Sequence, residues 1–213
     1  MTNPILTLLF PLAILFSNCG QTQSLKQQKD VEVGGPCDGC DVMYDGMPPA
    51  EKISNKAILA SEKEPGERME IQGAVFEKDG KTPAKNSILY VYHTDAKGLY
   101  TPSATQTAGR RNGRLRGWVK TDEEGKFTIF SIRPAAYPNA NIPAHIHILV
   151  KEPGKIRYYI DEVWFDDDPF VTKELKARAE KRGGDLLIHL TKTKGVWKGN
   201  LPIILGLHIP GYQ

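Results

Sequence analysis

The residues with the clearest chemical potential lie in the segment PAHIHILV, which carries His145 and His147. On a β-strand, residues i and i+2 point to the same face with Cα atoms ~6.6–6.8 Å apart, so two imidazoles can converge on one metal ion. Pro143 withholds a backbone donor, which is consistent with a strand that begins at a cavity. A half-buried strand with hydrogen-bonded histidines would show the same spacing, so the pair alone leaves both interpretations open.

A tyrosine stands eight residues before His145, in the segment RPAAYP. Pro138 disfavours a helical backbone at the preceding Tyr137 and holds this tyrosine on a stiff, extended connection to the histidine strand. The tyrosine therefore strengthens the interpretation of the pair as a metal site. We expect structural or surface roles for the remaining histidines, His93, His189 and His208.

The segments that must position these residues have the pattern of β-strands. From Met69 onward, short β-branched and aromatic runs alternate with turn pairs such as Asp79-Gly80 and Glu124-Gly125. We expect strands at 71–77, 87–93, 117–120, 127–131, 145–154, 156–165, 185–192 and 202–209. Strands at this spacing, divided by Gly, Pro and Asp turns, indicate an antiparallel β-sandwich rather than a βαβ sheet.

One segment near the C-terminus has a helical pattern instead. Residues 171–184, VTKELKARAEKRGG, are strong helix formers that end in two glycines suited to a left-handed cap. The basic last turn agrees with the helix dipole. The predicted fold class is therefore mainly β, an antiparallel β-sandwich with one short helix near the C-terminus.

Length and charge limit the classes of function. The chain has 213 residues, enough for one compact domain after a targeting segment and a tether. The formal net charge of +3 comes from 28 basic and 25 acidic residues without a Lys/Arg stripe, so we expect no nucleic-acid partner. The acidic triplet 166–168 is interpreted as a solvated loop rather than a cation site.

The N-terminus has the pattern of an export signal. The apolar stretch 5–16 has the length of a secretory core region and is too short to span a bilayer. It leads into Ser17-Asn18-Cys19-Gly20, which resembles a bacterial lipobox in which Cys19 is lipidated; an ordinary cleaved signal peptide is the alternative. We expect residues 1–19 to be a signal peptide. The exported protein is then either tethered to a membrane through Cys19 or secreted or periplasmic.

Residues 20–68 connect this signal to the domain at 69–213. Residues 20–35 are polar and Gln-rich and predict a flexible tether, and the Pro- and Gly-rich remainder predicts an irregular wrap. Cys37 and Cys40 form a CxxC motif with no second cysteine pair to complete a zinc site. In an oxidising compartment a disulfide is the plainer interpretation, with free thiols as the alternative.

The run from TDEEGKFTIFSIRPAAYP through PAHIHILV resembles the intradiol ring-cleavage dioxygenases, which are non-haem Fe(III) enzymes. In that family a tyrosine before this loop and both histidines of the PAHIH motif bind iron, which implies Tyr137, His145 and His147 here. The fourth ligand is a tyrosine in a segment of the form W-x-x-D-A-x-G-x-Y. This segment is YHTDAKGLY here, which assigns Tyr100. The resemblance runs from about residue 71 to about residue 190.

The resemblance also implies an activity. Members of the family open a catechol between its two hydroxyl groups with O2 and release a cis,cis-muconate-type diacid. Tyr137 would be the displaceable ligand and catalytic base, while the other three ligands stay bound. The implied cofactor is Fe(III), the implied partners are an aromatic diol and O2, and related enzymes often assemble, which favours a homo-oligomer.

Two positions depart from the family pattern. Ile142 stands where active members commonly have an Arg beside the iron, and Glu162 stands where a supporting Gln is expected. Losing a cation next to developing negative charge typically costs about 10²–10³ in rate. Arg133 and Arg116 are the candidates for supplying a cation from another direction.

Three functional hypotheses follow from this pattern. The first is an exported intradiol-type dioxygenase acting on a catechol-type diol. The second is a catalytically silent surface lipoprotein that binds iron or another ligand on the same sandwich. The third, a transthyretin-like sandwich for adhesion or assembly, requires the Tyr/His match to be coincidental.

Overall fold

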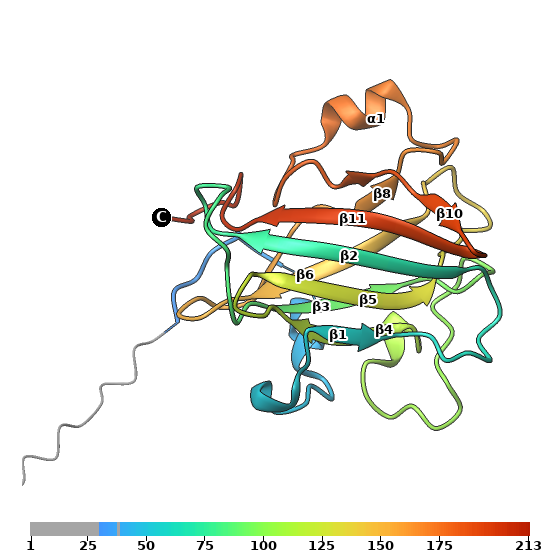
Figure 1. Ribbon diagram of the computed structural model, residues 1–213, viewed down its shortest axis with the longest axis horizontal. Coiled ribbons are helices and arrows are strands. Elements are labelled where there is room, and N and C mark those ends of the chain that lie inside the picture. Colours follow the sequence, from blue (N-terminus) through green and yellow to red (C-terminus); the bar gives the residue numbers. More distant parts are fainter. Residues whose placement is uncertain (1–29, 38) are drawn as a thin grey trace, which may run out of the picture.

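The computed structural model describes residues 30–37 and 39–213, which form two β-sheets packed face to face (Figure 1). The predicted signal peptide, including the lipidation site Cys19, lies outside the described residues. Within the described ranges, no helix combines the length and apolar character needed to cross a membrane.

The first sheet has five strands in the order β1-β5-β2-β11-β10 and lies in front in Figure 1. Its members are β1 (Lys56–Ile58), β2 (Arg68–Phe76), β5 (Lys126–Ile132), β10 (Thr191–Thr193) and β11 (Val196–Ile204). The second sheet runs β4-β3-β6-β8-β9, with β7 paired to β6. Its members are β3 (Ile88–His93), β4 (Arg116–Lys120), β6 (His145–Lys151), β7 (Tyr158–Tyr159), β8 (Val163–Phe165) and β9 (Leu187–Ile188).

The predicted sandwich is confirmed, but its sheets are mixed rather than wholly antiparallel. Strand β11 runs parallel to β2 along its length, and β1–β5 and β8–β9 are parallel as well. The remaining pairings, such as β3–β6 and β2–β5, are antiparallel. Hydrophobic alternation predicts which residues of a strand are buried, but it does not specify the partner of a strand distant in sequence.

The core between the sheets fixes which face of β6 carries the histidines. Ile146 and Ile148 are almost fully buried and belong to the inter-sheet core. Because side chains alternate along a strand, His145 and His147 point to the opposite, outer face of the second sheet. A register slip by one residue would expose these isoleucines, so core packing determines how the histidine pair is presented.

The segment before β2 covers part of that outer face. The 3-10 helix η1 (Cys40–Tyr44) buries Met43 in a second apolar cluster with Tyr90 and Leu149. A disulfide joins Cys37 to Cys40 at the start of this segment. The predicted wrap is not wholly irregular, because it contributes β1 and a further 3-10 helix, η2 (Ala50–Lys52). A third, η3 (Arg110–Asn112), lies in the loop before β4.

The only α-helix in the described part of the chain, α1 (Lys173–Arg178), is shorter than the predicted 171–184. Its first turn is capped by Thr172, whose hydroxyl accepts a hydrogen bond from the Leu175 amide at 3.1 Å. The backbone turns extended at Ala179, and no residue of the helix is buried. A helix without a buried face gains little from tertiary packing, so helix propensity alone does not extend it to the glycines. In Figure 1, α1 stands beyond β8 at the edge of the sandwich.

Candidate metal centre

Four polar side-chain atoms close a small ring on the outer face of the second sheet. The Tyr100 hydroxyl lies 2.9 Å from the Tyr137 hydroxyl, which lies 3.3 Å from Nε2 of His145. The two histidine Nε2 atoms are 3.0 Å apart, and Nε2 of His147 lies 3.0 Å from the Tyr100 hydroxyl. Bonds of about 2.0–2.1 Å to a shared cation would set neighbouring donors about 2.9–3.4 Å apart. The ring therefore has the dimensions of a mononuclear metal site.

A hydrogen bond at the start of β6 orients the His145 ring, with one nitrogen toward the four-donor ring. His145 is 6% exposed, and its Nδ1 lies 2.7 Å from the Pro143 carbonyl oxygen, which can only accept. Nδ1 therefore carries the proton, and the lone pair of Nε2 faces the ring. The Asp168 carboxylate anchors the start of the strand by accepting a hydrogen bond from the Ala144 amide at 2.9 Å.

The Tyr100 loop is ordered by a single buried carboxylate. Asp95 accepts hydrogen bonds from the Lys97 and Leu99 amides at 2.9 and 3.1 Å. Its other oxygen accepts from the Thr101 hydroxyl at 2.8 Å. These bonds enclose Tyr100 between two fixed neighbours, which gives a physical reason for the aspartate in the YHTDAKGLY segment.

The two tyrosine-bearing loops pack directly on each other. Gly98 has φ +76°, and a Cβ built on it would lie 2.0 Å from the Ala136 carbonyl oxygen. The Thr94 hydroxyl donates to the Ala135 carbonyl at 2.7 Å, which ties the same two loops together. Only glycine allows this approach, so the glycine of the segment helps bring Tyr100 to Tyr137.

Burial favours the neutral forms of two donors, His147 and Tyr100. The Tyr92 ring stacks on His147 with centroids 4.6 Å apart and an interplanar angle of 15°. Burial, and then the neighbouring His145, lower the pKa of His147 to about 3, so its imidazole stays neutral. Burial, and then the hydrogen bond with Tyr137, raise the pKa of Tyr100 well above its ordinary value. A phenol in this position ionises only when a cation compensates the charge.

His93 lies beneath this site and has no part in the ring. It is 1% exposed, and its two ring nitrogens lie 2.7 Å from the Thr94 carbonyl and the Ser131 hydroxyl. Burial lowers the pKa of His93 to about 4. Both nitrogens are satisfied, as a structural histidine requires.

A solvent-open cavity of about 430 Å³ adjoins the ring. The donors Tyr137, His145 and His147 line it, whereas Tyr100 does not. The rest of its wall is formed by Asn141, Ile142, Pro143, Glu162, Trp164, Phe170, Thr172, Glu174, Leu175 and Arg178. A mainly apolar cavity with a few converging polar groups is the usual form of a small-molecule site.

The family assignment rests on the match of most of the chain to a known sequence family. The family described as "Dioxygenase" matches residues 43–196. The chain belongs to the intradiol ring-cleavage dioxygenases. It is 30% identical over 125 residues to catechol 1,2-dioxygenase 2 of Acinetobacter lwoffii, covering 51% of this chain and 43% of that protein. It is 29% identical over 113 residues to the protocatechuate 3,4-dioxygenase beta chain of Burkholderia cepacia, covering 50% and 48%.

The chain thus spans less than half the length of these two relatives. Among solved structures, the dioxygenase domain of a dioxygenase carbohydrate-binding protein fusion from Streptomyces sp. SirexAA-E has a TM-score of 0.55 at 21% identity, covering 84% of this chain and 97% of that one. Catechol 1,2-dioxygenase from Acinetobacter sp. ADP1 has a TM-score of 0.56 at 23% identity, covering 71% and 56%. These structures share the intradiol dioxygenase sandwich with this chain.

The two departures from the intradiol dioxygenase pattern both lie at the cavity. Ile142, 45% exposed, and the half-buried Glu162, which directly precedes β8, both line it. Arg133 does not line the cavity: its guanidinium binds both oxygens of Asp167 and lies over the Phe165 ring. Neither does Arg116, which donates to the Tyr90 hydroxyl at 2.9 Å.

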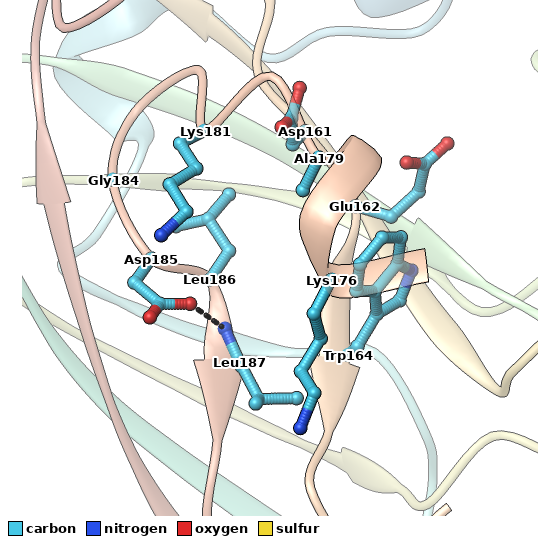
Figure 2. Close-up of a pocket in the computed structure, with 10 residues that line it drawn as sticks. All are labelled: Asp161, Glu162, Trp164, Lys176, Ala179, Lys181, Gly184, Asp185, Leu186 and Leu187. Carbon is cyan, nitrogen blue, oxygen red and sulfur yellow. Dashed lines mark hydrogen bonds between the residues drawn. The ribbon is translucent and has the colours of Figure 1, made fainter. Parts of the chain in front are cut away.

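Several wall residues could not be recognised from the sequence. Trp164 lies between the buried Val163 and Phe165 on β8, yet it is half-buried and lines the cavity. Thr172, Leu175 and Arg178 come from α1 and its cap, a helix that the sequence indicated without showing which surface it covers. The same Trp164 and Glu162 also line a smaller hollow of about 160 Å³ beside α1 (Figure 2).

Proposed function

We propose that this chain binds Fe(III) through Tyr100, Tyr137, His145 and His147 and inserts O2 into a catechol-type diol. The carbon–carbon bond between the two hydroxyl-bearing carbons breaks, both oxygen atoms enter the product, and a muconate-type diacid forms. The closed ring of four donor atoms beside a cavity carries this proposal. The names of the relatives, catechol 1,2-dioxygenase and protocatechuate 3,4-dioxygenase, support the same reaction class.

The donor set suits a hard trivalent cation. Two phenolate oxygens supply negative charge, and two neutral imidazoles complete the set without adding more. When bound, Fe(III) supplies Lewis-acid stabilisation of the ionised diol. The hydrogen bond from His145 to the Pro143 carbonyl and the stack of Tyr92 on His147 keep both imidazoles oriented for this role.

The two tyrosines have different tasks because only one faces the cavity. Tyr137 lines it and lies on a loop, so its phenolate can accept the proton of an entering diol hydroxyl. Tyr100 is packed against Tyr92 and held by the Asp95 loop, so it remains a ligand. This assignment makes Tyr137 the catalytic base.

The apolar wall of the cavity holds the aromatic ring of the substrate. Ile142, Trp164 and Leu175 present apolar surface close to the donors and displace water from the ring of the diol. The substrate oxygens then meet the donor ring while its carbon skeleton stays against these side chains.

Oxygen uptake by the Fe(III)-loaded protein tests the proposal. With catechol, we expect one O2 consumed per diol and a ring-opened diacid as product. Tyr137→Phe should abolish turnover while diol binding persists. Diol binding without oxygen uptake on any diol would contradict the enzymatic role and favour the silent binding protein. Ile142→Arg should raise the turnover number if the missing cation limits the rate.

We further propose that the protein is exported, on the strength of the N-terminal segment alone. Membrane fractionation of the full chain and of Cys19→Ala separates a lipid tether from simple secretion. A membrane-bound wild type and a released variant are expected for lipidation at Cys19, whereas release of both supports plain cleavage of the signal.

A further inference from the structure

The wall of the donor cavity contains a carboxylate that the proposed chemistry does not use. Glu162 is half-buried and lines the cavity together with Tyr137, His145 and His147. Burial, and then the Glu162 charge beside it, raise the pKa of Tyr159 well above its ordinary value. The Glu162 carboxylate therefore lies close to Tyr159 as well as at the wall of the donor cavity.

No cation of the described chain forms an ion pair with this carboxylate. None of the ion pairs formed within residues 30–37 and 39–213 includes Glu162. Lys176 and Lys181 line the neighbouring hollow, and their ammonium groups are turned away from the Glu162 carboxylate (Figure 2). Among the residues that line the cavity, Glu174 adds a second acid, and the one permanently charged cation is the exposed Arg178 at the end of α1.

The charges of the proposed site leave Glu162 uncompensated. In the proposed site the diol would lose one proton to Tyr137 and one to water, and the three positive charges of Fe(III) would then be matched by the doubly ionised diol and one remaining tyrosinate, because a ligating imidazole carries no charge. An anionic substituent on the diol would therefore face an unpaired, half-buried carboxylate, which is unfavourable. A cationic substituent would pair with it in a site partly shielded from water.

We infer that the cavity selects diols whose ring substituent carries an ammonium group, which pairs with Glu162, over diols that carry a carboxylate. This inference rests on the proposed function and specifies its substrate class. Arg178 would favour the diol with a carboxylate over the diol with an ammonium group. It is solvent-exposed, so its attraction for an anion is screened more strongly than that of the half-buried Glu162 for a cation.

Binding of three catechols of matched size tests the inference. Dopamine, hydroxytyrosol and homoprotocatechuate carry an ammonium, a neutral hydroxyl and a carboxylate on the same short side chain. Calorimetric titration of the Fe(III)-loaded protein without O2 measures binding rather than turnover. Relative to hydroxytyrosol, we expect dopamine to bind about 3- to 10-fold tighter and homoprotocatechuate about 3- to 10-fold weaker.

Two variants locate the charge responsible. Glu162→Gln keeps the shape of the side chain and should bring the three dissociation constants to within about 2-fold of one another. Glu174→Gln, the matched control from α1, should leave the wild-type order in place. Loss of the order in Glu174→Gln alone would overturn the assignment to Glu162.

The order of the three affinities in the wild-type protein tests the inference even if a variant does not fold. Equal affinities, or tightest binding of homoprotocatechuate with a loss in Arg178→Gln, would overturn the inference while leaving the proposed function intact. If none of the three diols binds to the iron-loaded protein, the proposed function fails and the inference falls with it.

Discussion

Replacing Gly98 by alanine tests whether the contact between the two tyrosine loops assembles the donor ring. Gly98 has φ +76°, and an added Cβ would meet the Ala136 carbonyl oxygen at 2.0 Å and its carbon at 2.9 Å. No carbon–oxygen contact of 2.0 Å is tolerated, so the loops must separate by about 1 Å to regain ordinary contact. Because Tyr100 follows Gly98 closely and Tyr137 follows Ala136 directly, the 2.9 Å contact between their hydroxyls should lengthen.

A matched control separates the expected loss of stability in Gly98→Ala into a backbone part and a packing part. Gly154 has nearly the same φ, +75°, but nothing lies within 4 Å of a Cβ built there. Gly154→Ala should therefore cost only the left-handed backbone term, about 1–2 kcal/mol of unfolding free energy. Gly98→Ala should cost a further 1–3 kcal/mol or so for the forced movement of packed loops.

Urea unfolding of the metal-free variants and Fe(III) titration of the folded ones provide the measurements. We expect Gly98→Ala to lose about 10- to 100-fold in iron affinity, which is the usual effect of removing a residue that orients a metal ligand. Gly154→Ala should bind iron like the wild type. Equal stability losses in the two variants, with iron affinity unchanged in both, would refute the role assigned to the loop contact.

Two further predictions concern the support beneath the ring. Asp168→Asn should cost about 1–3 kcal/mol of unfolding free energy, because the Asp168 carboxylate accepts hydrogen bonds from the Ala144 and Phe170 amides. The control Asp166→Asn, at the surface, should cost less than about 1 kcal/mol. Equal losses of the two variants in urea unfolding would contradict this prediction. Burial holds the pKa of His93 at about 4, below its unfolded value of about 6.5, so the unfolded chain binds more protons between these values. The metal-free protein should therefore lose up to about 1.4 kcal/mol of stability per pH unit from this histidine as the pH falls from about 6.5 to 4, and a flat urea-unfolding profile over this range would count against it.

The sequence was sufficient for the sandwich and for the local form of the histidine strand. Alternation along 145–150 separates Ile146 and Ile148 from His145 and His147, and this period-2 pattern survives in the folded strand. The parallel pairing of β11 with β2 was not predictable, because it depends on which distant strand completes the sheet edge. The helix pattern likewise extended beyond Arg178, since propensity does not report the absence of a buried face.

The candidate site divides in the same way. The histidine pair was expected from strand geometry and motif and the two tyrosines mainly from the family resemblance, and the structure brings all four side chains together. The part of the cavity wall that α1 and its cap contribute was not expected, because this helix reaches the cavity from a segment about thirty residues further along the chain. Which face of such a helix meets a cavity is set by the whole tertiary arrangement rather than by the local sequence.

The visible absorption of the Fe(III)-loaded protein tests the central claim, that both tyrosines bind the same ion. We predict a red-brown protein with a tyrosinate-to-iron charge-transfer band that shifts or bleaches in Tyr100→Phe. Tyr92→Phe is the matched control, because Tyr92 packs against both Tyr100 and His147 without joining the ring, and its band should match that of the wild type. A protein that stays colourless and iron-free after loading, or a band unchanged in Tyr100→Phe, would contradict the account.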